Sequence, residues 1–420
     1  MAKPPTGLSP FTIRIPDADV ADLGTRLSAS RYPSEPLDEG WKKGVPQPYL
    51  QHIAEHWRDR FDWRVQERGL NEHPQFLTEI DGQTFHLIHA RSAHPGAIPL
   101  LLLHGWPGSV AEFARIIGPL TDPSGHGHPD TPSFHVVAPS HPGFAFSMPL
   151  TKNWTNTAMA TAYAELMSRL GYENYLVQGG DIGAMIAPQV AAVDASRVLG
   201  VHLNAASLGF IPAGPVDDAV LAELDPLSLQ RLESIATNNA VGMGYYVIQA
   251  TKPQTLSYGL TDSPVGQLAW ILEKFHDWTD RAHPLPEDAV DLDQMLTNVS
   301  LYWFTRTAGT SANWYHTFYS SLLAGADANA PYTQDVPVGV VAFREDWSIR
   351  YFGEQSHRIT HWSDIDSGGH FAAMETPELL VADLRTFAAA AVQQRSQVPS
   401  ASCRAAAALP TIESSGASHD

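Results

Sequence analysis

The spacing of hydrophobic and polar residues changes several times along the chain, and each change marks an expected element. Residues 11–16 alternate like a short strand, and residues 17–31 repeat apolar side chains at helical spacing behind Asp17, a residue type that often caps helices. A second helical pattern covers residues 49–61. We therefore expect residues 1–75 to form a largely helical N-terminal extension that wraps around the rest, not a separate enzyme.

Apolar runs and helical stretches then alternate through residues 76–206. Residues 76–80 and 85–90 predict a hairpin, because Asp-Gly between them is a common two-residue turn. Residues 98–103 are apolar throughout, which is typical of a strand buried on both faces of a parallel sheet. Further strands are expected at 134–138, 175–178 and 198–203, with helices at 109–117, 157–170 and 182–192. This alternation predicts an α/β fold with a mostly parallel, doubly wound sheet.

The strand pattern stops near residue 207 and returns near residue 331. The segment 207–330 is rich in Leu, Ala, Tyr and Trp at helical spacing, so we expect it to be an α-helical lid inserted into the core. The second part of the core, 331–392, holds expected strands at 337–343 and 359–365 and a last helix at 377–392. The Ser- and Ala-rich tail, 393–420, is expected to be disordered.

Composition narrows the class of protein. Hydrophobic residues make up 44% of the 420 residues, and 45 acidic residues against 26 basic ones give a net charge of −19. An acidic surface repels phosphate backbones, so we expect no nucleic-acid partner. The single cysteine, Cys403, cannot form an intrachain disulfide, which fits a reducing cytoplasm. We find no signal peptide and no apolar stretch of membrane-spanning length, so we expect a soluble cytoplasmic protein without a membrane anchor.

The strongest local motif, Gln-Gly-Gly-Asp-Ile-Gly at residues 178–183, lies between an expected strand and an expected helix. Small residues in this context indicate a nucleophile elbow, a sharp turn that projects one side chain from the edge of the sheet. The central residue here is Asp181, whose carboxylate attacks carbon without needing a base to activate it. The alternative is that Asp181 only caps the following helix.

A second motif, His-Gly-Trp-Pro-Gly at residues 104–108, follows the Leu-rich strand. Small residues there allow a backbone N–H to point at a developing oxyanion, and the second donor is the N–H of the residue after the nucleophile. We therefore predict that Trp106 and Ile182 form an oxyanion hole. The alternative is an ordinary Gly/Pro turn at the end of a strand.

The base and its acid are expected after the last two strands. His370 follows two glycines between the last strand and the last helix. Proteins with a nucleophile elbow carry their catalytic histidine at this place in the chain. Asp346 follows the preceding strand and is our choice for the carboxylate that orients His370, with Glu345 as its rival. The alternative is that Asp346 and Glu345 belong to a cluster of charged side chains that is exposed to solvent. Asp364 and Asp366 are further candidates, although they lie at the end of the histidine's own strand.

These motifs resemble those of the microsomal-type epoxide hydrolases and their soluble bacterial and fungal relatives. The resemblance runs from about Pro10 to Val392. It includes Phe-Asp-Trp-Arg at 61–64 and Leu-Asn-Glu-His-Pro-Gln-Phe at 70–76, which look like the family's N-terminal extension, and the segments 104–109, 179–183 and 368–373. It implies the α/β-hydrolase fold and the conversion of epoxides to vicinal diols through an ester on Asp181 that water, activated by His370, hydrolyses.

The resemblance also implies two tyrosines on the lid that donate protons to the epoxide oxygen. The segments at 244–253 and 301–303 point to Tyr245 and Tyr315, with Tyr246 and Tyr319 as neighbours that could be confused with them. Packing with a hydrogen-bonded hydroxyl is the commoner fate of such tyrosines. The expected partners are a small-molecule epoxide and water, with no cofactor and no metal, and a homodimer is one option for the assembly.

The sequence departs from the family at two positions. Arg344 stands where the family usually has Pro, and His141 stands where an apolar residue is usual. We expect His141 to lie on the surface, the alternative being an effect on substrate preference. Two other functions stay open: a haloalkane dehalogenase, which typically has Trp where Ile182 stands, and a catalytically silent small-molecule carrier.

Overall fold

The computed structural model describes residues 7–34, 39–325 and 335–397. Within these residues, nine strands form one sheet in the order β1-β2-β3-β5-β4-β6-β7-β8-β9. The first three strands and β5 pair antiparallel, and the pairs from β5 to β9 are parallel. Their bounds are β1 Ser9–Phe11, β2 Gln75–Ile80, β3 Gln83–Ala90, β4 Ile98–Leu103, β5 Phe134–Pro139, β6 Tyr175–Gly180, β7 Val198–Asn204, β8 Val338–Ala342 and β9 Ile359–Asp364.

Strand β4 shows why the sheet is buried on both faces. Leu100 and Leu102 pack in the cluster that contains side chains of α4 and α17, whereas Leu101 and Leu103 pack in the cluster that contains side chains of α5 and α6. Side chains alternate across a strand, so an apolar residue at every position requires a helical layer on each face. These core helices are α4 Ala114–Thr121, α5 Asn156–Arg169, α6 Ile182–Val193, α15 Arg350–Ser356, α16 Ala372–Glu375 and α17 Pro377–Gln397, and short 3-10 turns span Val110–Phe113 and Ser124–His126.

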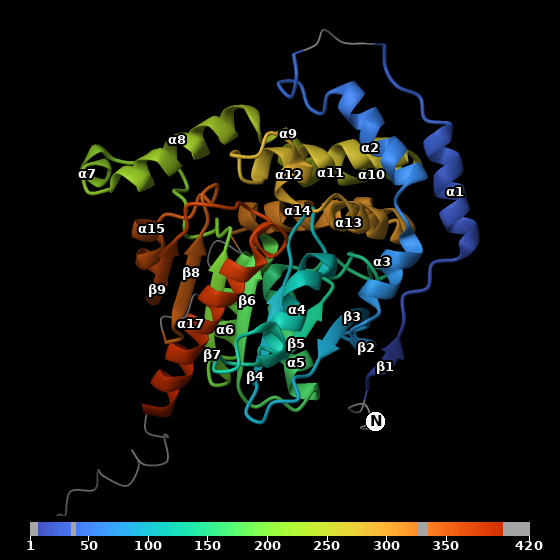
Figure 1. The fold of residues 1–420 in the computed structure, drawn as a ribbon. Coiled ribbons are helices and arrows are strands. Elements are labelled where there is room, and N and C mark those ends of the chain that lie inside the picture. The colour runs from blue at the N-terminus through green and yellow to red at the C-terminus, as the bar shows by residue number, and fades with distance from the viewer. Residues whose placement is uncertain (1–6, 35–38, 326–334, 398–420) are drawn as a thin grey trace, which may run out of the picture.

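The helices between β7 and β8 lie over one end of the sheet, and we call residues 207–325 the lid (Figure 1). They are α7 Asp218–Leu221, α8 Pro226–Val241, α9 Gly244–Thr251, α10 Pro253–Asp262, α11 Pro264–Trp278, α12 Pro286–Ala289, α13 Leu292–Thr305 and α14 Ala308–Leu323. The strand ends that face the lid are the carboxyl ends, where ligands bind in sheets of this kind.

The N-terminal helices run along one side of the lid and the sheet (Figure 1): α1 Asp17–Ser28, α2 Gln47–Asp59 and α3 Trp63–Leu70. Trp57 of α2 donates its indole N–H to Ser300 of α13 at 2.9 Å. Arg26 of α1 forms an ion pair with Asp262 of α10 at 3.1 Å. Leu23 and Ile53 also belong to the apolar cluster that contains lid side chains such as Leu268, so the extension contacts the lid through both apolar packing and polar bonds.

The expected strands from 76–80 onward are confirmed, with ends that shift by at most two residues. Four details differ from the expectation. The first strand is Ser9–Phe11 rather than 11–16, because Pro16 and the residues before it leave the sheet; helix α3 was missed; and residues 109–117 split into a 3-10 turn and α4. Helix α17 continues to Gln397, so residues 393–397 are helical and not part of a disordered tail. The rest of that tail and Cys403 lie outside the described residues.

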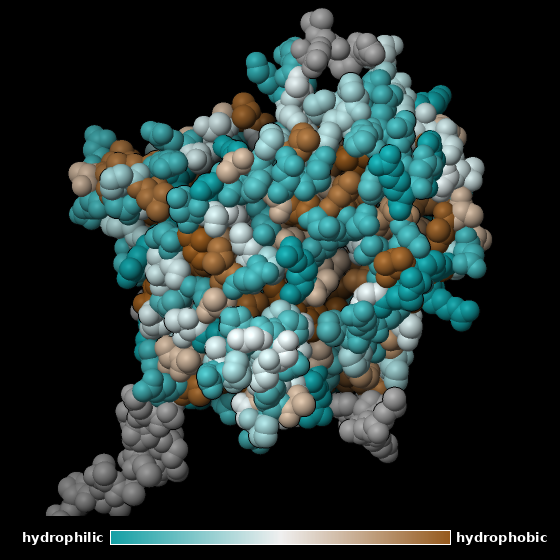
Figure 2. Space-filling model, in the orientation of Figure 1, coloured by the Kyte–Doolittle hydropathy of each residue, from teal (hydrophilic) through white to brown (hydrophobic). Residues whose placement is uncertain are grey.

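The surface seen in Figure 2 is mainly hydrophilic, in keeping with the excess of acidic residues, and its apolar patches are small and separate. None of the helices in the described ranges combines the length and the apolar character needed to cross a membrane.

Candidate active site

Asp181 lies at a sharp turn between β6 and α6. Its backbone has φ 56°, a left-handed value that is uncommon for residues other than glycine, and its side chain makes no capping hydrogen bond to α6. The glycines beside it are needed for close packing, because a Cβ on Gly183 would lie 2.1 Å from the carbonyl oxygen of Leu103. The geometry is that of a nucleophile elbow, and helix capping does not account for the position of Asp181.

The loop after β4 brings backbone donors to the carboxylate. The N–H of Trp106 donates to Oδ1 of Asp181 at 2.9 Å, and the adjacent N–H of Ile182 lowers the pKa of the same carboxyl group. Gly105 leaves room for the approach, since a Cβ there would lie 2.5 Å from Oδ1. The structure thus brings both predicted oxyanion donors to Asp181.

Burial and hydrogen bonding act on Asp181 in opposite directions. Removal from water raises the pKa of the carboxyl group, while the charge of His370 and the N–H groups of Trp106 and Ile182 lower it. Burial is the larger effect, so the pKa of Asp181 lies above its usual value. The donors limit this rise and favour the ionised form, which is the form able to attack carbon.

His370 lies in the loop between β9 and α16. Its backbone N–H donates to the carbonyl oxygen of Trp278 at 2.9 Å, and its ring packs on the Trp278 ring with centroids 4.8 Å apart. Its Nε2 lies 3.7 Å from Oδ2 of Asp181. Burial lowers the pKa of His370, and the charges of Asp181 and Asp346 raise it. The imidazole is therefore biased toward the neutral form that a general base requires.

Asp346 and Glu345 differ in their surroundings. Asp346 is buried, accepts hydrogen bonds from the N–H of Ala205 at 2.7 Å and of Ser348 at 2.8 Å, and acts electrostatically on His370. Glu345 instead forms an ion pair with Arg281 at 3.5 Å. The surroundings favour Asp346 as the partner of the histidine.

Arg344, which departs from the family pattern, ties the loop of Asp346 to the loop of His370. Its guanidinium forms an ion pair with Asp280 at 3.0 Å. The other carboxylate oxygen of Asp280 accepts the N–H of Gly368 at 2.9 Å. The arginine therefore supports the arrangement of the acid and the histidine.

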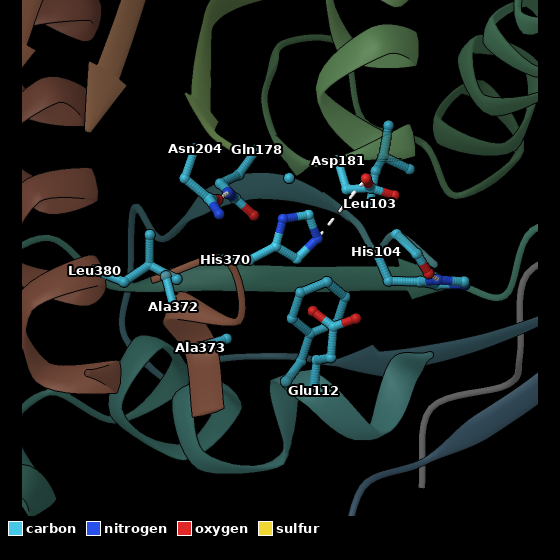
Figure 3. Close-up of a pocket in the computed structure, with 13 residues that line it drawn as sticks. Leu103, His104, Glu112, Gln178, Asp181, Asn204, His370, Ala372, Ala373 and Leu380 are labelled. Atoms are coloured by element: carbon cyan, nitrogen blue, oxygen red, sulfur yellow. Dashed lines mark hydrogen bonds and ion pairs between the residues drawn. The ribbon is translucent and has the colours of Figure 1, made fainter. Parts of the chain in front are cut away.

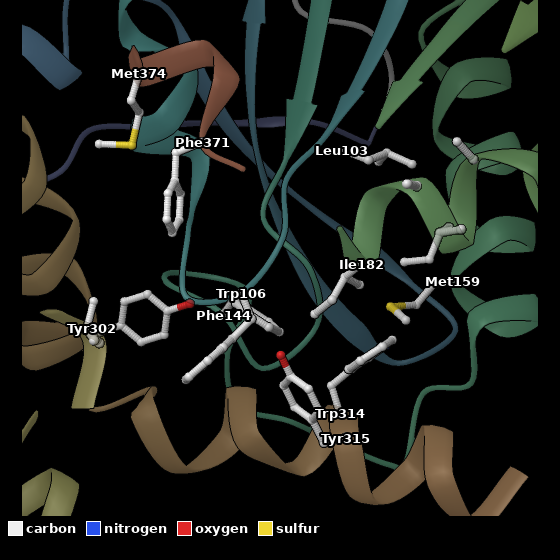
Figure 4. Packing of buried hydrophobic residues seen from close by; sticks show 14 of the residues in the cluster. Leu103, Trp106, Phe144, Met159, Ile182, Tyr302, Trp314, Tyr315, Phe371 and Met374 are labelled. Atoms are coloured by element: carbon white, nitrogen blue, oxygen red, sulfur yellow. The ribbon is translucent and has the colours of Figure 1, made fainter. Parts of the chain in front are cut away.

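The side chains of Tyr245 in α9 and Tyr315 in α14 both extend from the lid and contact Trp106. The ring of Tyr245 stacks on Trp106 with centroids 5.2 Å apart, and Tyr315 meets Trp106 edge-on at 5.6 Å. Figure 4 shows the Tyr315 hydroxyl directed toward the loop of Trp106 and the start of α6 at Ile182. Burial is the main cause that raises the pKa of both phenols, so both stay protonated at neutral pH.

The neighbouring tyrosines are less suited to this position. Tyr246 lines the cavity beside Asp181 and packs edge-on against Tyr315 with ring centroids 5.5 Å apart. It is Tyr245, however, that stacks on Trp106 and whose pKa the charge of Asp181 raises. Tyr319 is 36% exposed, and it does not line the cavity.

A cavity of about 440 Å³ joins these groups, and five of the predicted residues line it: Asp181, Tyr245, Tyr315, Asp346 and His370. Trp278, Trp314 and Phe318 supply apolar walls that the sequence did not single out, because aromatic residues recur throughout the lid. The arrangement suits an apolar small molecule with one reactive polar group. In the described part of the chain, no group of three or more His, Cys, Asp or Glu side chains is arranged to hold a metal ion.

The prediction for His141 is wrong, because its side chain is fully buried. One ring nitrogen lies 2.5 Å from the Tyr163 hydroxyl and the other lies 2.7 Å from the carbonyl oxygen of His104. Burial lowers the pKa of His141 to about 4, so the ring is neutral at pH 7 and both nitrogens are satisfied. His141 supports the strand end that precedes the oxyanion loop.

This combination of sheet, elbow and lid defines an α/β-hydrolase. The family described as "alpha/beta hydrolase fold" matches residues 98–376, and the one described as "Epoxide hydrolase N terminus" matches residues 8–113. A Stigmatella aurantiaca protein named as a candidate epoxide hydrolase is 43% identical over 90% of this chain and 84% of its own. Epoxide hydrolase 1 of Sus scrofa is 36% identical over 92% and 90%.

A solved structure of an epoxide hydrolase is also similar to this chain. The crystal structure of juvenile hormone epoxide hydrolase from the silkworm Bombyx mori has a TM-score of 0.83 and 31% identity, covering 93% of this chain and 96% of that one. The chain belongs to the epoxide hydrolase family.

Proposed function

We propose that the protein opens epoxides to vicinal diols in two steps, through a covalent ester on Asp181. One observation carries this proposal: the two oxygens of the Asp181 carboxylate have different partners. Oδ1 accepts the N–H of Trp106 at 2.9 Å, and Oδ2 lies 3.7 Å from Nε2 of His370. Tyr245 and Tyr315 line the cavity above them.

In the first step, a carboxylate oxygen of Asp181 attacks one epoxide carbon and the carbon–oxygen bond of the ring breaks. Tyr245 and Tyr315 donate hydrogen bonds to the departing oxygen, which takes the proton of one of them and becomes a hydroxyl group while that tyrosine becomes a phenolate. An alkoxide is a poor leaving group, so proton donation lowers the barrier to ring opening.

In the second step, His370 takes a proton from water as the water oxygen adds to the carbonyl carbon of the ester. The N–H groups of Trp106 and Ile182 stabilise the oxyanion. The ester bond then breaks, the diol oxygen takes the proton from His370, and Asp181 is left as a carboxylic acid. Its proton returns to the tyrosine that protonated the epoxide oxygen, so Asp181 is a carboxylate again and both tyrosines are phenols. Asp346 stabilises the cationic histidine between these events.

Substitution of the nucleophile tests the proposal. Purified protein is offered styrene, cyclohexene and long-chain aliphatic epoxides, and Asp181→Asn should abolish diol formation while the unfolding midpoint stays near that of the parent. Asn keeps the size of the side chain but does not attack carbon. Diol formation by the variant would remove Asp181 as nucleophile.

Two controls separate the other functions. Halide release from chloro- and bromoalkanes would favour a dehalogenase, although Ile182 replaces the Trp expected of that class. Binding of epoxides without turnover would favour a carrier.

A further inference from the structure

A second, much smaller cavity lies on the sheet side of the nucleophile (Figure 3). Its volume is about 20 Å³, and both Asp181 and His370 contribute to its wall. A space of this size accommodates about one water molecule, provided that two or more polar groups face it.

Polar side chains other than the catalytic pair do face it. Gln178, Asn204 and Glu112 line the cavity. Gln178 donates its amide N–H to Asn204 at 2.8 Å, and within the described residues its own Oε1 is buried without a hydrogen-bond partner. A buried acceptor without a partner costs free energy, and a water molecule in the cavity would satisfy it.

Glu112 is the unexpected member of this group. It is a single acid between Ala111 and Phe113 in the turn after the oxyanion loop, and no motif in the sequence singles it out. Gly108 makes room for it, because a Cβ on that glycine would lie 1.2 Å from Oε1 of Glu112. Thus Gly105 accommodates the Asp181 carboxyl group, and Gly108 accommodates that of Glu112.

Charge coupling links Glu112 to the nucleophile. Burial and the charge of Asp181 raise the pKa of Glu112 to about 8, although the N–H groups of Gly105 and Ser109 lower it. At neutral pH it is therefore mainly a neutral acid, able both to donate and to accept a hydrogen bond.

We propose that this small cavity binds the water molecule that hydrolyses the ester, and that Glu112 and Gln178 hold it beside His370. Figure 3 shows the His370 ring between Asp181, Gln178 and Glu112. The water donates one hydrogen bond to His370, which takes that proton, and a second hydrogen bond to Gln178 Oε1, which leaves the other proton on the water oxygen. A lone pair of that oxygen adds to the carbonyl carbon of the Asp181 ester. Glu112 orients the water by hydrogen bonding and exchanges no proton in the step. This inference rests on the proposed two-step function.

Rapid quenching with mass spectrometry separates the two steps, with styrene oxide as the probe. Glu112→Leu and Gln178→Leu each remove one hydrogen-bonding partner of the water. Adduct formation should continue at close to the parental rate, and adduct hydrolysis should slow roughly 10- to 100-fold, the effect of one buried hydrogen bond to a reacting group. Glu112→Gln keeps a donor and an acceptor, so its hydrolysis rate should lie between those of Glu112→Leu and the parent.

Glu375→Gln is the matched control. Burial raises the pKa of Glu375 to about 8 as well, and its carboxylate accepts the N–H groups of Phe371 and Asp280, but it does not line the small cavity. This variant should keep the parental ratio of the two rates, even if its unfolding midpoint falls.

Several outcomes would overturn the inference. One is an unchanged hydrolysis rate in both leucine variants, and another is an equal loss in both steps. If the leucine variants fail to fold, a crystal structure of the parent decides: an ordered water bonded to Gln178 and Glu112 supports the inference, and an empty cavity refutes it. A parent that never forms an adduct refutes the proposed function instead.

Discussion

Trp106 donates its backbone N–H to Oδ1 of Asp181, so the oxyanion donors already hold one oxygen of the nucleophile before any substrate binds. The other oxygen, Oδ2, remains on the side of His370. If Oδ2 attacks the epoxide, Oδ1 becomes the carbonyl oxygen of the ester in the position where the donors already lie. Donors fixed in advance lose no free energy to reorganisation during the reaction.

Replacing the base should separate the two steps. In His370→Gln the carboxylate of Asp181 still attacks the epoxide, but the water has no base, so hydrolysis of the ester should slow by roughly 100-fold or more. A protein species heavier by the mass of the epoxide should then accumulate in intact-mass spectra. Parental turnover without such a species would contradict the role of His370.

The lid tyrosines should act on the first step alone. Tyr245→Phe and Tyr315→Phe should each slow adduct formation by about 10- to 100-fold, and the double variant should lose at least as much as the worse single one. Hydrolysis of a preformed adduct should be unaffected. Tyr319→Phe is the control, since that side chain is more exposed and lies outside the cavity. An equal loss of rate in Tyr319→Phe would contradict the assignment of Tyr245 and Tyr315 as the proton donors.

The pH profile follows from the directions of the pKa shifts. Burial lowers the pKa of His370 below 6.5, so the base is mainly neutral at pH 6.5 and the rate should fall only below that value, as His370 and Asp181 take up protons. The phenol pKa values are raised above 10, so the rate of adduct formation, which kcat/KM reports, should not fall on the alkaline side before about pH 10. Measured kcat/KM that declines between about pH 7 and 9 would contradict the assignment of the two tyrosines.

Local sequence patterns predicted the core strands and the turn at Asp181, because both depend on residues that are close together in the chain. Leu100 to Leu103 are apolar at every position, which requires a strand with both faces covered, and the glycines around Asp181 are dictated by backbone approach within a few residues. The family resemblance, rather than helical spacing, selected Tyr245 and Tyr315. Their meeting over Asp181 depends on how α9 and α14 pack, which spacing does not encode.

The features that the sequence did not predict depend on residues that are distant from one another in the chain. His141 is buried because Tyr163 and His104 satisfy its ring, and neither is adjacent in sequence. Likewise, Arg344 supports the site through Asp280, 64 residues away. A single acid among apolar residues was the one local sign of Glu112, and such a sign alone does not distinguish a buried acid from an exposed one.

The central claim is that an oxygen of Asp181 is transferred to the product, and one turnover in H₂¹⁸O measures this directly. With enzyme in excess over epoxide, the diol should carry no label, and the label should appear in the peptide that contains Asp181. Labelled diol from that first turnover would mean that water attacks the epoxide ring itself, and the covalent account would be wrong.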